Sequence, residues 1–367
     1  MQFNKINQFP QKIKYEIRKN ISNIVKHNKF IMGPEVQKLE EKLKQITLSK
    51  YCLGVSSGTD ALLISLMALN IKRGDEIIVP SFSWISTASV VKLIYAKPIF
   101  VDVDQSTCNI DCDKIAKAVT KKTKGIIFTS LFGNVPDVDK INLIAKKNRL
   151  FVIEDGAQSF GAKYKSKNSC NLSTIGCTSF FPSKPLGAFG DAGAIFTNNQ
   201  KLYKKMKAIR VHGQLKRHHH DILGINGRID TIQCAILIAK IKYFKKELNL
   251  RKKKYLYYKN FFNQNNFKHI KVLDYEKFGK SAFAQFCILT NKRNFLIKIF
   301  KNHKIPYAIY YPKIMDEQKI FKAKKNKINI NSIKVSKKII SIPFSPYISK
   351  KEQDRVLNLI KKYEKFL

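Results

Sequence analysis

The first fifty residues carry apolar positions three or four residues apart, a spacing that predicts amphipathic helices. One helix is expected over residues 11–27, with a buried face made of Ile13, Ile17, Ile21 and Ile24. Pro34 suits the first turn of a second helix, whose buried face would consist of Val36, Leu39, Leu43 and Ile46. A short strand over 51–55 and a polar turn over 56–60 follow.

From this turn to residue 197, short apolar runs alternate with helical periods. Strands are expected at 76–79, 98–101, 125–130, 150–153 and 193–197, and helices at 61–69, 84–94, 112–119 and 138–147. Such alternation predicts an α/β fold with a mostly parallel central sheet and flanking helices. Ligands of these sheets bind beyond the carboxyl ends of the strands. The 56–60 turn and Asp155 both lie at such ends.

The pattern changes after residue 197. Residues 226–262 have the character of long, lysine-rich helices. Beyond them, strands are expected at 282–289 and 306–310, and helices at 293–302 and 350–363. We therefore predict a large domain over residues 1–245 and a smaller C-terminal α/β domain over residues 246–367.

The charge of the chain is unusual, but it changes this interpretation little. There are 69 lysines and arginines against 26 acidic residues, which gives a formal net charge of +43. A large basic excess often indicates nucleic-acid binding. Here the lysines are spread along the whole chain among many Asn and Ile residues, as codon bias in an AT-rich genome would produce. A non-catalytic regulator that binds nucleic acid is therefore kept only as the alternative to an enzyme.

The cysteines and the N-terminal region predict a cytoplasmic protein. Seven cysteines include no CxxC pair, which fits a reducing compartment. Residues 1–29 lack the apolar core of a signal peptide, and no run approaches the roughly 20 apolar residues of a membrane span. The run His218-His219-His220 invites a metal interpretation, but no Cys or acidic motif with ligand spacing accompanies it, so no metal site is predicted.

One lysine stands in a setting unlike the others. Lys184 follows the apolar pair Phe180-Phe181, lies between Pro182 and Pro185, and precedes a glycine-rich turn. A lysine held on a stiff loop against apolar residues loses hydration, which lowers its pKa toward a nucleophilic amine. Such an amine can form a Schiff base with a carbonyl compound or with pyridoxal phosphate. The alternative is an ordinary surface lysine in a Pro-Gly loop.

Two further stretches would complete such a site. Asp155 ends a buried strand, and a carboxylate placed there in a pyridoxal-phosphate enzyme keeps the ring nitrogen protonated. In the 56–60 turn, Gly58 permits close approach of the backbone, and the N–H groups of the first helical turn with the hydroxyls of Ser57 and Thr59 make an anion site. The alternatives are an acid that caps the next loop and an ordinary capped turn. The separation of Asp155 from Lys184 fits two neighbouring strand ends.

Three more residues are candidates on their chemistry. Trp84, the only tryptophan, could stack on a cofactor ring, or it could be an ordinary core or surface aromatic. Asn226 and Arg228 precede a predicted helix and could meet phosphate or diphosphate. The alternative there is a capped helix with a solvated arginine. The chain has no dinucleotide fingerprint, Walker loop or nucleophile-elbow motif.

Together these residues resemble the DegT/StrS family of sugar-nucleotide aminotransferases, which are fold type I pyridoxal-phosphate enzymes. The matching motifs run in family order across nearly the whole chain: Phe30-x-x-Gly33-Pro34-Glu35, Ser57-Gly-Thr-Asp-Ala-Leu62, Pro80-Ser-Phe-Ser-Trp84, Glu154-Asp-Gly-Ala-Gln-Ser159, Thr178-Ser-Phe-Phe-Pro-Ser-Lys-Pro-Leu-Gly187, His212-Gly-Gln214, Asn226-x-Arg-x-Asp-x-x-Gln-x-Ala235 and Tyr311-Pro312.

The resemblance implies a role for each candidate. Lys184 would hold pyridoxal 5'-phosphate as a Schiff base and move a proton between substrate and cofactor, and Asp155 would hold the ring nitrogen. Trp84 would stack on the ring and Gln158 would lie near its phenolic oxygen. The phosphate would be held by Gly58, Thr59 and Ser179, with Asn226 of the partner subunit. The sugar-nucleotide pocket would be lined by Phe30, Ser183, Arg228, Tyr310 and Tyr311. A site shared in this way implies an obligatory homodimer.

Within the family, residues 169–174 and 177–184 resemble the subgroup that acts on UDP-2-acetamido-2-deoxy-3-oxo-D-glucuronate, with L-glutamate as donor and 2-oxoglutarate as by-product. That reaction makes a 3-amino sugar for bacterial surface polysaccharide. Another 3- or 4-keto UDP-, dTDP- or GDP-sugar stays open, because the chain departs from the subgroup. Tyr310 stands where His is usual, Phe30 where Tyr is common, and Gly156 where a small or bulkier residue is usual. Dehydratases of the same fold usually have His at the Schiff-base position, so Lys184 disfavours that reaction.

Overall fold

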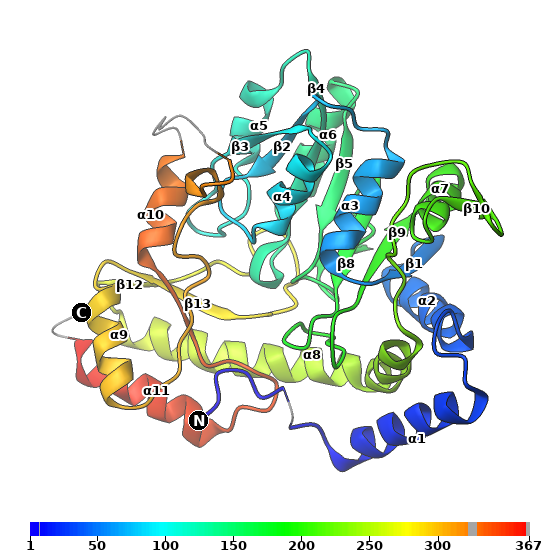
Figure 1. Cartoon of the computed structure of the whole chain (residues 1–367). Helices are drawn as coiled ribbons and strands as arrows, with labels where there is room; N and C mark the ends of the chain where they lie inside the picture. Colours follow the sequence, from blue (N-terminus) through cyan, green and yellow to red (C-terminus); the bar gives the residue numbers. More distant parts are fainter. Residues whose placement is uncertain (7, 322–328, 365–367) are drawn as a thin grey trace.

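A seven-stranded sheet forms the centre of the larger part of the molecule (Figure 1). In the computed structural model, which describes residues 1–6, 8–321 and 329–364, the strand order is β1 (Tyr51–Val55), β9 (Gly193–Thr197), β8 (Ile175–Ser179), β5 (Phe151–Asp155), β4 (Thr123–Thr129), β2 (Glu76–Pro80) and β3 (Lys97–Val101). β9 runs antiparallel to both of its neighbours, and the remaining neighbours pair in parallel. The predicted mostly parallel sheet is confirmed.

Helices cover both faces of this sheet. Successive strand residues point to opposite sides, and because these strands carry apolar side chains on both sides, both faces must be buried. Ile77 and Ile153 pack on the side of α3 (Gly58–Ala68), α4 (Ser86–Leu93) and α7 (Gln200–Ile209). Ile78 and Val152 pack on the opposite side, against α5 (Cys112–Ala118) and α6 (Val138–Lys147). The prediction of a helix over 84–94 is corrected at its start, since Trp84 lies in the turn before α4.

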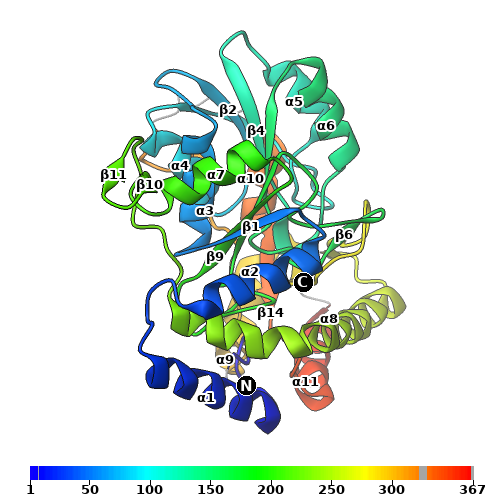
Figure 2. The same cartoon turned by 90° about the vertical axis from the view of Figure 1, so that its right-hand side faces the viewer.

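One long helix connects the two parts of the chain. α8 spans Thr231–Asn265, where the sequence predicted several helices, and its 35 residues extend about 52 Å at 1.5 Å per residue. Its first half packs beside α1 (Gln11–His27) and α2 (Pro34–Thr47), as Figure 2 shows. Its second half contributes Tyr255, Tyr258 and Phe262 to the core of the smaller part. Residue 245 therefore lies inside a continuous helix, and a division at that point stays a prediction.

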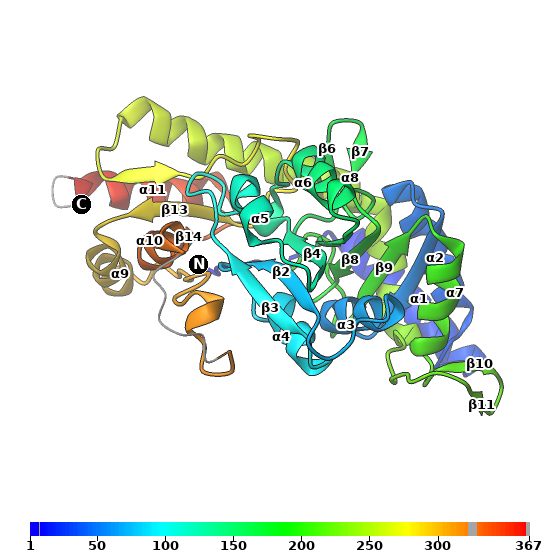
Figure 3. The same ribbon diagram turned by 90° about the horizontal axis from the view of Figure 1, so that it is seen from above.

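The smaller part is built on an antiparallel sheet in the order β12 (Ile270–Val272), β13 (Phe286–Thr290), β14 (Ile339–Ile342), with α9 (Arg293–Asn302), α10 (Ile330–Lys338) and α11 (Lys350–Lys362). The predicted strand over 306–310 is wrong. Only Ala308 forms a bridge, to Ser341, because Pro306 has no N–H to donate and the chain then turns toward the large sheet. Figure 3 shows these helices at one end of the molecule and the hairpin β10 (Gln214–Lys216) and β11 (His219–His220) at the other.

The remaining short elements are β6 (Lys163–Tyr164), β7 (Lys167–Asn168), and the 3₁₀ turns η1 (Leu131–Gly133) and η2 (Met315–Glu317). Across the part of the chain that the structure describes, no helix combines the length and the apolarity needed to cross a membrane.

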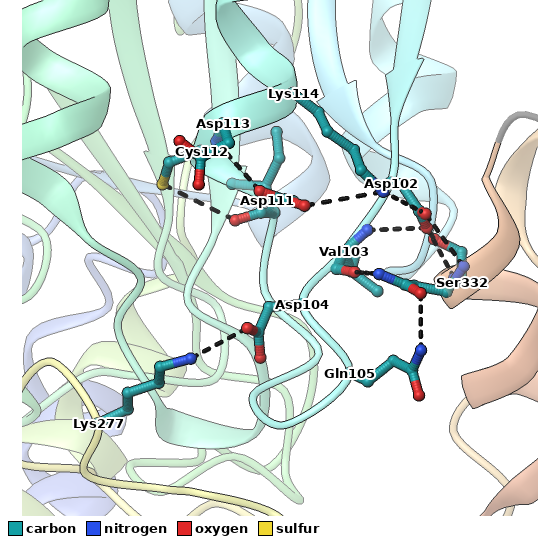
Figure 4. Close-up of polar contacts among 12 residues, drawn as sticks. Asp102, Val103, Asp104, Gln105, Asp111, Cys112, Asp113, Lys114, Lys277 and Ser332 are labelled. Carbon is teal, nitrogen blue, oxygen red and sulfur yellow. Dashed lines mark hydrogen bonds and ion pairs between the residues drawn. The ribbon is translucent and has the colours of Figure 1, made fainter.

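A buried carboxylate at the end of β3 holds the smaller part in place (Figure 4). Asp102 accepts hydrogen bonds from the backbone N–H groups of Asn331 at 3.0 Å and Ser332 at 2.7 Å, in the first turn of α10, and from the Ser332 hydroxyl at 2.6 Å. Lys114 donates to the same carboxylate at 2.8 Å. Burial raises the pKa of Asp102, but hydrogen bonds from Lys114 and Ser332 outweigh it, so the pKa lies below its ordinary value. Asp102 therefore caps a helix more than two hundred residues away in the chain.

A second tie joins the end of β2 to the segment after the tyrosine pair. The hydroxyl of Ser81 donates to Asp316 at 2.6 Å, and the Ser81 carbonyl accepts from the N–H of Met315 at 2.7 Å. Since Ala308 is bridged to β14, residues 309–314 are fixed at both ends. This fixes Tyr310 and Tyr311 between the two sheets.

Candidate active site

Asp155 and Lys184 come from neighbouring strands of the large sheet. β5 and β8 pair in parallel with Asp155 opposite Cys177, so the loop that follows β8 lies beside the end of β5. The attraction of Asp155 raises the pKa of Lys184, although burial of the amine has the larger, opposite effect. The structure thus brings together the two residues on which the sequence prediction depends.

The surroundings of Asp155 follow from its position in the strand. Asp155 lies two residues after Ile153 in β5, so its side chain points to the same face, toward α3 and α4. There it is 5 % exposed. Thr87 of α4 donates its hydroxyl to the carboxylate at 2.7 Å, and the N–H of Ala157 donates at 3.3 Å. Burial raises the pKa of Asp155, while Thr87, Ala157 and the nearby Lys184 oppose this rise.

The adjacent Glu154 points to the opposite face and has a different function. It accepts hydrogen bonds from Ser169 at 2.6 Å, Ser130 at 3.2 Å and the N–H of Cys170 at 2.7 Å. Burial raises its pKa to about 7, and these hydrogen bonds limit the rise. Glu154 therefore holds the 169–170 loop, and only Asp155 faces Lys184.

Thr87 is a residue that sequence reasoning missed. Its side chain is fully buried, and its hydroxyl also lies 3.3 Å from that of Ser83, which in turn lies 3.1 Å from that of Thr129. Three hydroxyls from α4, the preceding turn and β4 thus lead to Asp155. The available signal was a threonine at a buried position of a predicted helix, but its partner is 68 residues away in the chain.

The Lys184 loop is short and closed by its own backbone. The N–H of Lys184 donates to the carbonyl of Phe181 at 2.9 Å, and the N–H of Ala188 donates to the carbonyl of Phe180 at 2.7 Å. Lys184 is half-buried, and burial lowers the pKa of its amine from the ordinary lysine value. A larger share of neutral amine at a given pH is what a nucleophilic lysine requires.

The predicted phosphate turn packs directly against β8. A Cβ atom added to Gly58 would lie 2.7 Å from the Cβ atom of Ser179, so no side chain fits there. Thr59 shares a hydroxyl contact of 2.8 Å with Ser86. The alternative of a capped turn is also realised, because the Ser57 hydroxyl accepts the N–H of Asp60 at 3.0 Å. Gly58, Thr59 and Ser179 are therefore gathered at the start of α3.

Aromatic residues from both parts of the chain meet around Tyr311. Gln158 donates to the hydroxyl of Tyr311 at 3.1 Å, and its own carbonyl accepts the N–H of Phe132 at 2.7 Å. The rings of Trp84 and Tyr311 have centroids 5.8 Å apart, and Tyr310 lies 5.7 Å from Tyr311. Trp84 remains 56 % exposed, so much of its ring is free. Burial raises the pKa of Tyr311, which is therefore a neutral hydrogen-bonding group.

The remaining candidates lie on two other segments. Phe30 accepts the N–H of Thr231 at 3.2 Å through its carbonyl, and Asn226 is exposed and bridged to Val211. Arg228 is bridged to Val55, next to the 56–60 turn, and its Nε atom is buried without a partner among the described residues. The backbone of Ser183, beside Lys184, accepts a hydrogen bond from Asn4 at 3.2 Å.

This arrangement defines a class of protein. A buried carboxylate facing a lysine of lowered pKa, beside the N-terminus of a helix, suits chemistry that a bound aldehyde cofactor would perform. The chain belongs to the DegT/DnrJ/EryC1/StrS aminotransferase family, whose sequence pattern matches residues 11–361.

Individual relatives cover almost the whole chain. It is 42 % identical over 337 residues to the UDP-2-acetamido-2-deoxy-3-oxo-D-glucuronate aminotransferase of Pseudomonas aeruginosa, with 92 % of this chain and 93 % of that protein covered. Among solved structures, a DegT DnrJ EryC1 StrS aminotransferase from Brucella abortus shares 32 % identity with a TM-score of 0.94, covering 99 % of each chain. NtdA from Bacillus subtilis with bound cofactor PMP shares 28 % identity with a TM-score of 0.92, covering 99 % of this chain and 84 % of that chain.

The sequence predictions of the family, of an aminotransferase and of a fold type I α/β architecture are therefore confirmed.

Proposed function

We propose that this protein transfers an amino group from L-glutamate to UDP-2-acetamido-2-deoxy-3-oxo-D-glucuronate, with pyridoxal 5'-phosphate as cofactor. The observation that carries the proposal is the 42 % identity with an aminotransferase named for that substrate, 93 % of which is covered, joined to the electrostatic attraction between Lys184 and Asp155. The product would be a 3-amino sugar for bacterial surface polysaccharide such as the O-antigen of lipopolysaccharide. Nucleotide sugars and glutamate are cytoplasmic metabolites, so we place the reaction in the cytoplasm.

The residues present fit the proposed cofactor. Because Gly58 has no side chain, the start of α3 packs closely against Ser179, and the backbone N–H groups of this first turn favour a phosphate. Trp84 offers an exposed aromatic ring on the same side of the sheet. The Nε of Arg228, which has no hydrogen-bond partner within the described ranges, adds a donor next to this turn.

When bound, pyridoxal phosphate supplies an aldehyde that amines attack and a ring that takes up electrons from the bond being broken. In our proposal, the amine of Lys184 would hold the cofactor and would then move a proton between substrate and cofactor. Asp155 would hold the ring nitrogen through its carboxylate. Gln158 would face the phenolic oxygen, and Thr59 and Ser179 would hold the phosphate.

The substrate pocket in this proposal combines both parts of the chain. Tyr310 and Tyr311 approach from the smaller part, and Ser183 lies beside Lys184. Arg228 suits the diphosphate, since a guanidinium binds phosphate oxygens in pairs. Phe30 would complete the apolar wall.

We further propose that the working unit is a homodimer with shared sites. Segments around the site expose large apolar side chains that a second copy would cover, namely Phe30, Ile31, Met32, Trp84, Phe181 and Phe189. Asn226 is exposed in one chain, as a residue that reaches the phosphate of a partner would be. Sedimentation should give twice the 42.3 kDa of a single chain. A monomer that is fully active would contradict the shared site.

The function is tested by incubating the purified protein with pyridoxal phosphate, glutamate and the UDP-3-keto sugar acid. We expect 2-oxoglutarate and the 3-amino sugar nucleotide by mass spectrometry, and no product from Lys184→Ala. Keto sugars linked to dTDP or GDP are run in parallel. If borohydride fixes the cofactor to Lys184 but only another keto sugar is turned over, the proposed substrate is refuted and the aminotransferase activity is retained. If no cofactor is fixed, no keto sugar is turned over and the protein binds nucleic acid, the alternative of a non-catalytic regulator is favoured.

A further inference from the structure

A second buried lysine lies directly behind the Lys184 loop. Lys240, on α8, is 5 % exposed in a run that is otherwise apolar, from Cys234 to Ala239. Burying an ammonium group in an apolar environment costs several kcal/mol unless strong partners compensate. A leucine or methionine would fill the same space without that cost. The presence of a lysine at this position therefore requires an explanation that packing does not supply.

The partners of Lys240 belong to the loop that carries Lys184. Its amine donates a hydrogen bond to the backbone carbonyl of Gly187, three residues after Lys184. It also lies over the ring of Phe9, with Nζ 4.7 Å from the ring centroid. Burial lowers the pKa of Lys240 to about 8, while Glu247 opposes this shift.

A second side chain of α8 holds the same loop two turns earlier. The side-chain carbonyl of Gln233 accepts the N–H of Phe189 at 3.0 Å. Residues seven apart lie on one face of a helix, so Gln233 and Lys240 contact the loop from the same face of α8. Gln233 accepts a hydrogen bond from the loop, and Lys240 donates one to it. Phe9 completes the enclosure by stacking on Phe189, with ring centroids 5.8 Å apart.

The loop has little freedom of its own at the contacted residue. A Cβ atom added to Gly187 would lie 2.4 Å from the carbonyl oxygen of Pro182, so the chain folds back closely on itself there. Fixing the Gly187 carbonyl to α8 therefore also fixes the turn between Pro182 and Pro185 that contains Lys184. α8 is a continuous 35-residue helix, which makes it a suitable support.

We propose that Lys240 is a positioning residue that clamps the Lys184 loop to α8 and so sets the place of the Lys184 amine beside Asp155. The inference deepens the proposed function and rests on it for the role of Lys184. The clamp itself is a property of the protein without cofactor, so it can be tested separately.

The test compares Lys240→Met, which removes the donor and keeps the length, with Lys240→Arg, which keeps a donor. Lys242→Met is the matched control, because Lys242 lies on the same helix with a side chain 55 % exposed and paired to Glu16. The first readout is amide hydrogen exchange of peptides covering residues 180–190. Loss of a hydrogen bond from a charged donor should speed exchange there about tenfold or more in Lys240→Met, with partial rescue in Lys240→Arg and no change in Lys242→Met.

The second readout is the pH profile of reductive methylation at Lys184, measured by mass spectrometry without cofactor. We expect the profile of Lys240→Met to move toward that of an ordinary exposed lysine, because a released loop lets water reach the amine. Exchange and methylation that match the parent in Lys240→Met would overturn the proposal. Failure of the parent itself to bind pyridoxal phosphate would refute the proposed function, and the two readouts would still decide whether Lys240 clamps the loop.

Discussion

Replacing Thr87 by valine isolates the hydroxyl that supports Asp155. Valine has nearly the same shape, and Thr87 is fully buried, so the change leaves no room for water to replace the lost donor. The hydrogen bond lost is 2.7 Å long and ends on a carboxylate that is itself buried. Asp155 keeps the longer contact of 3.3 Å from the Ala157 N–H.

The magnitude follows from the charge of the acceptor. A hydrogen bond to a charged group contributes about 1.5–3 kcal/mol, and each 1.4 kcal/mol changes an equilibrium constant tenfold, so binding of pyridoxal phosphate should weaken about 10- to 100-fold. The loss should depend on pH. Burial already raises the pKa of Asp155, and removing Thr87 raises it further, so the ionised form becomes scarcer as pH falls. The affinity difference should therefore be largest in mild acid and shrink at alkaline pH.

The assay is a spectroscopic titration of cofactor-free protein with pyridoxal phosphate across pH. Thr87→Ser keeps the hydroxyl and should bind much more tightly than Thr87→Val. Thr47→Val is the control for a buried threonine elsewhere, since the Thr47 hydroxyl bonds to the carbonyl of Leu43 within α2. Thr87→Val that stays folded and binds as tightly as the parent at every pH would refute the reasoning about Asp155.

Three other changes follow from the same geometry. Asp102→Ala should lower the free energy of unfolding by about 2–3 kcal/mol, because the first turn of α10 loses its cap; chemical denaturation measures it. Folding lowers the pKa of Asp102, so this stabilisation is fully present above the pKa of an unfolded aspartate, about 3.9. It disappears as the pH falls through the lower pKa of the folded protein. If the stability of the variant and of the parent depended equally on pH, the assignment would be contradicted. Gly58→Ala should weaken cofactor binding at least tenfold, about 1.4 kcal/mol, because its Cβ atom would meet Ser179 at 2.7 Å, and calorimetric titration tests this. Tyr311→Phe should raise KM for the sugar nucleotide severalfold, on the order of 0.5–1.5 kcal/mol, with kcat changed less, because Gln158 loses one partner while the ring packing remains; an unchanged KM would remove Tyr311 from the pocket.

Local periodicity accounts for most of the correct fold predictions. The helices over 11–27 and 138–147 begin and end where their apolar spacing begins and ends. Six of the seven strands of the large sheet were predicted because they are short apolar runs between polar turns, but β8, which leads into the Lys184 loop, was not predicted. The expected strand over 306–310 failed, because its place is decided by two distant anchors, Ser341 and Ser81.

The chemistry of the site divides in the same way. Lys184 and Asp155 could be selected from the sequence, because prolines around the lysine and an acid at a strand end are visible within a few residues. Thr87 and Lys240 could not be selected. Their neighbourhoods show only a threonine within a predicted helix and a lysine after an apolar run, and the partners that give them a role lie 68 and 53 residues away.

By itself, then, the sequence determined most of the succession of strands and helices, the family, and the choice of Lys184 and Asp155 as candidates, because each depends on motifs that are short in sequence. Only the tertiary structure decided which hydroxyl supports Asp155, which lysine holds the loop of Lys184, and which carboxylate caps α10. Those contacts join side chains from separate elements, and a hydrogen bond requires its two atoms within about 3 Å, a condition that only the packed fold satisfies.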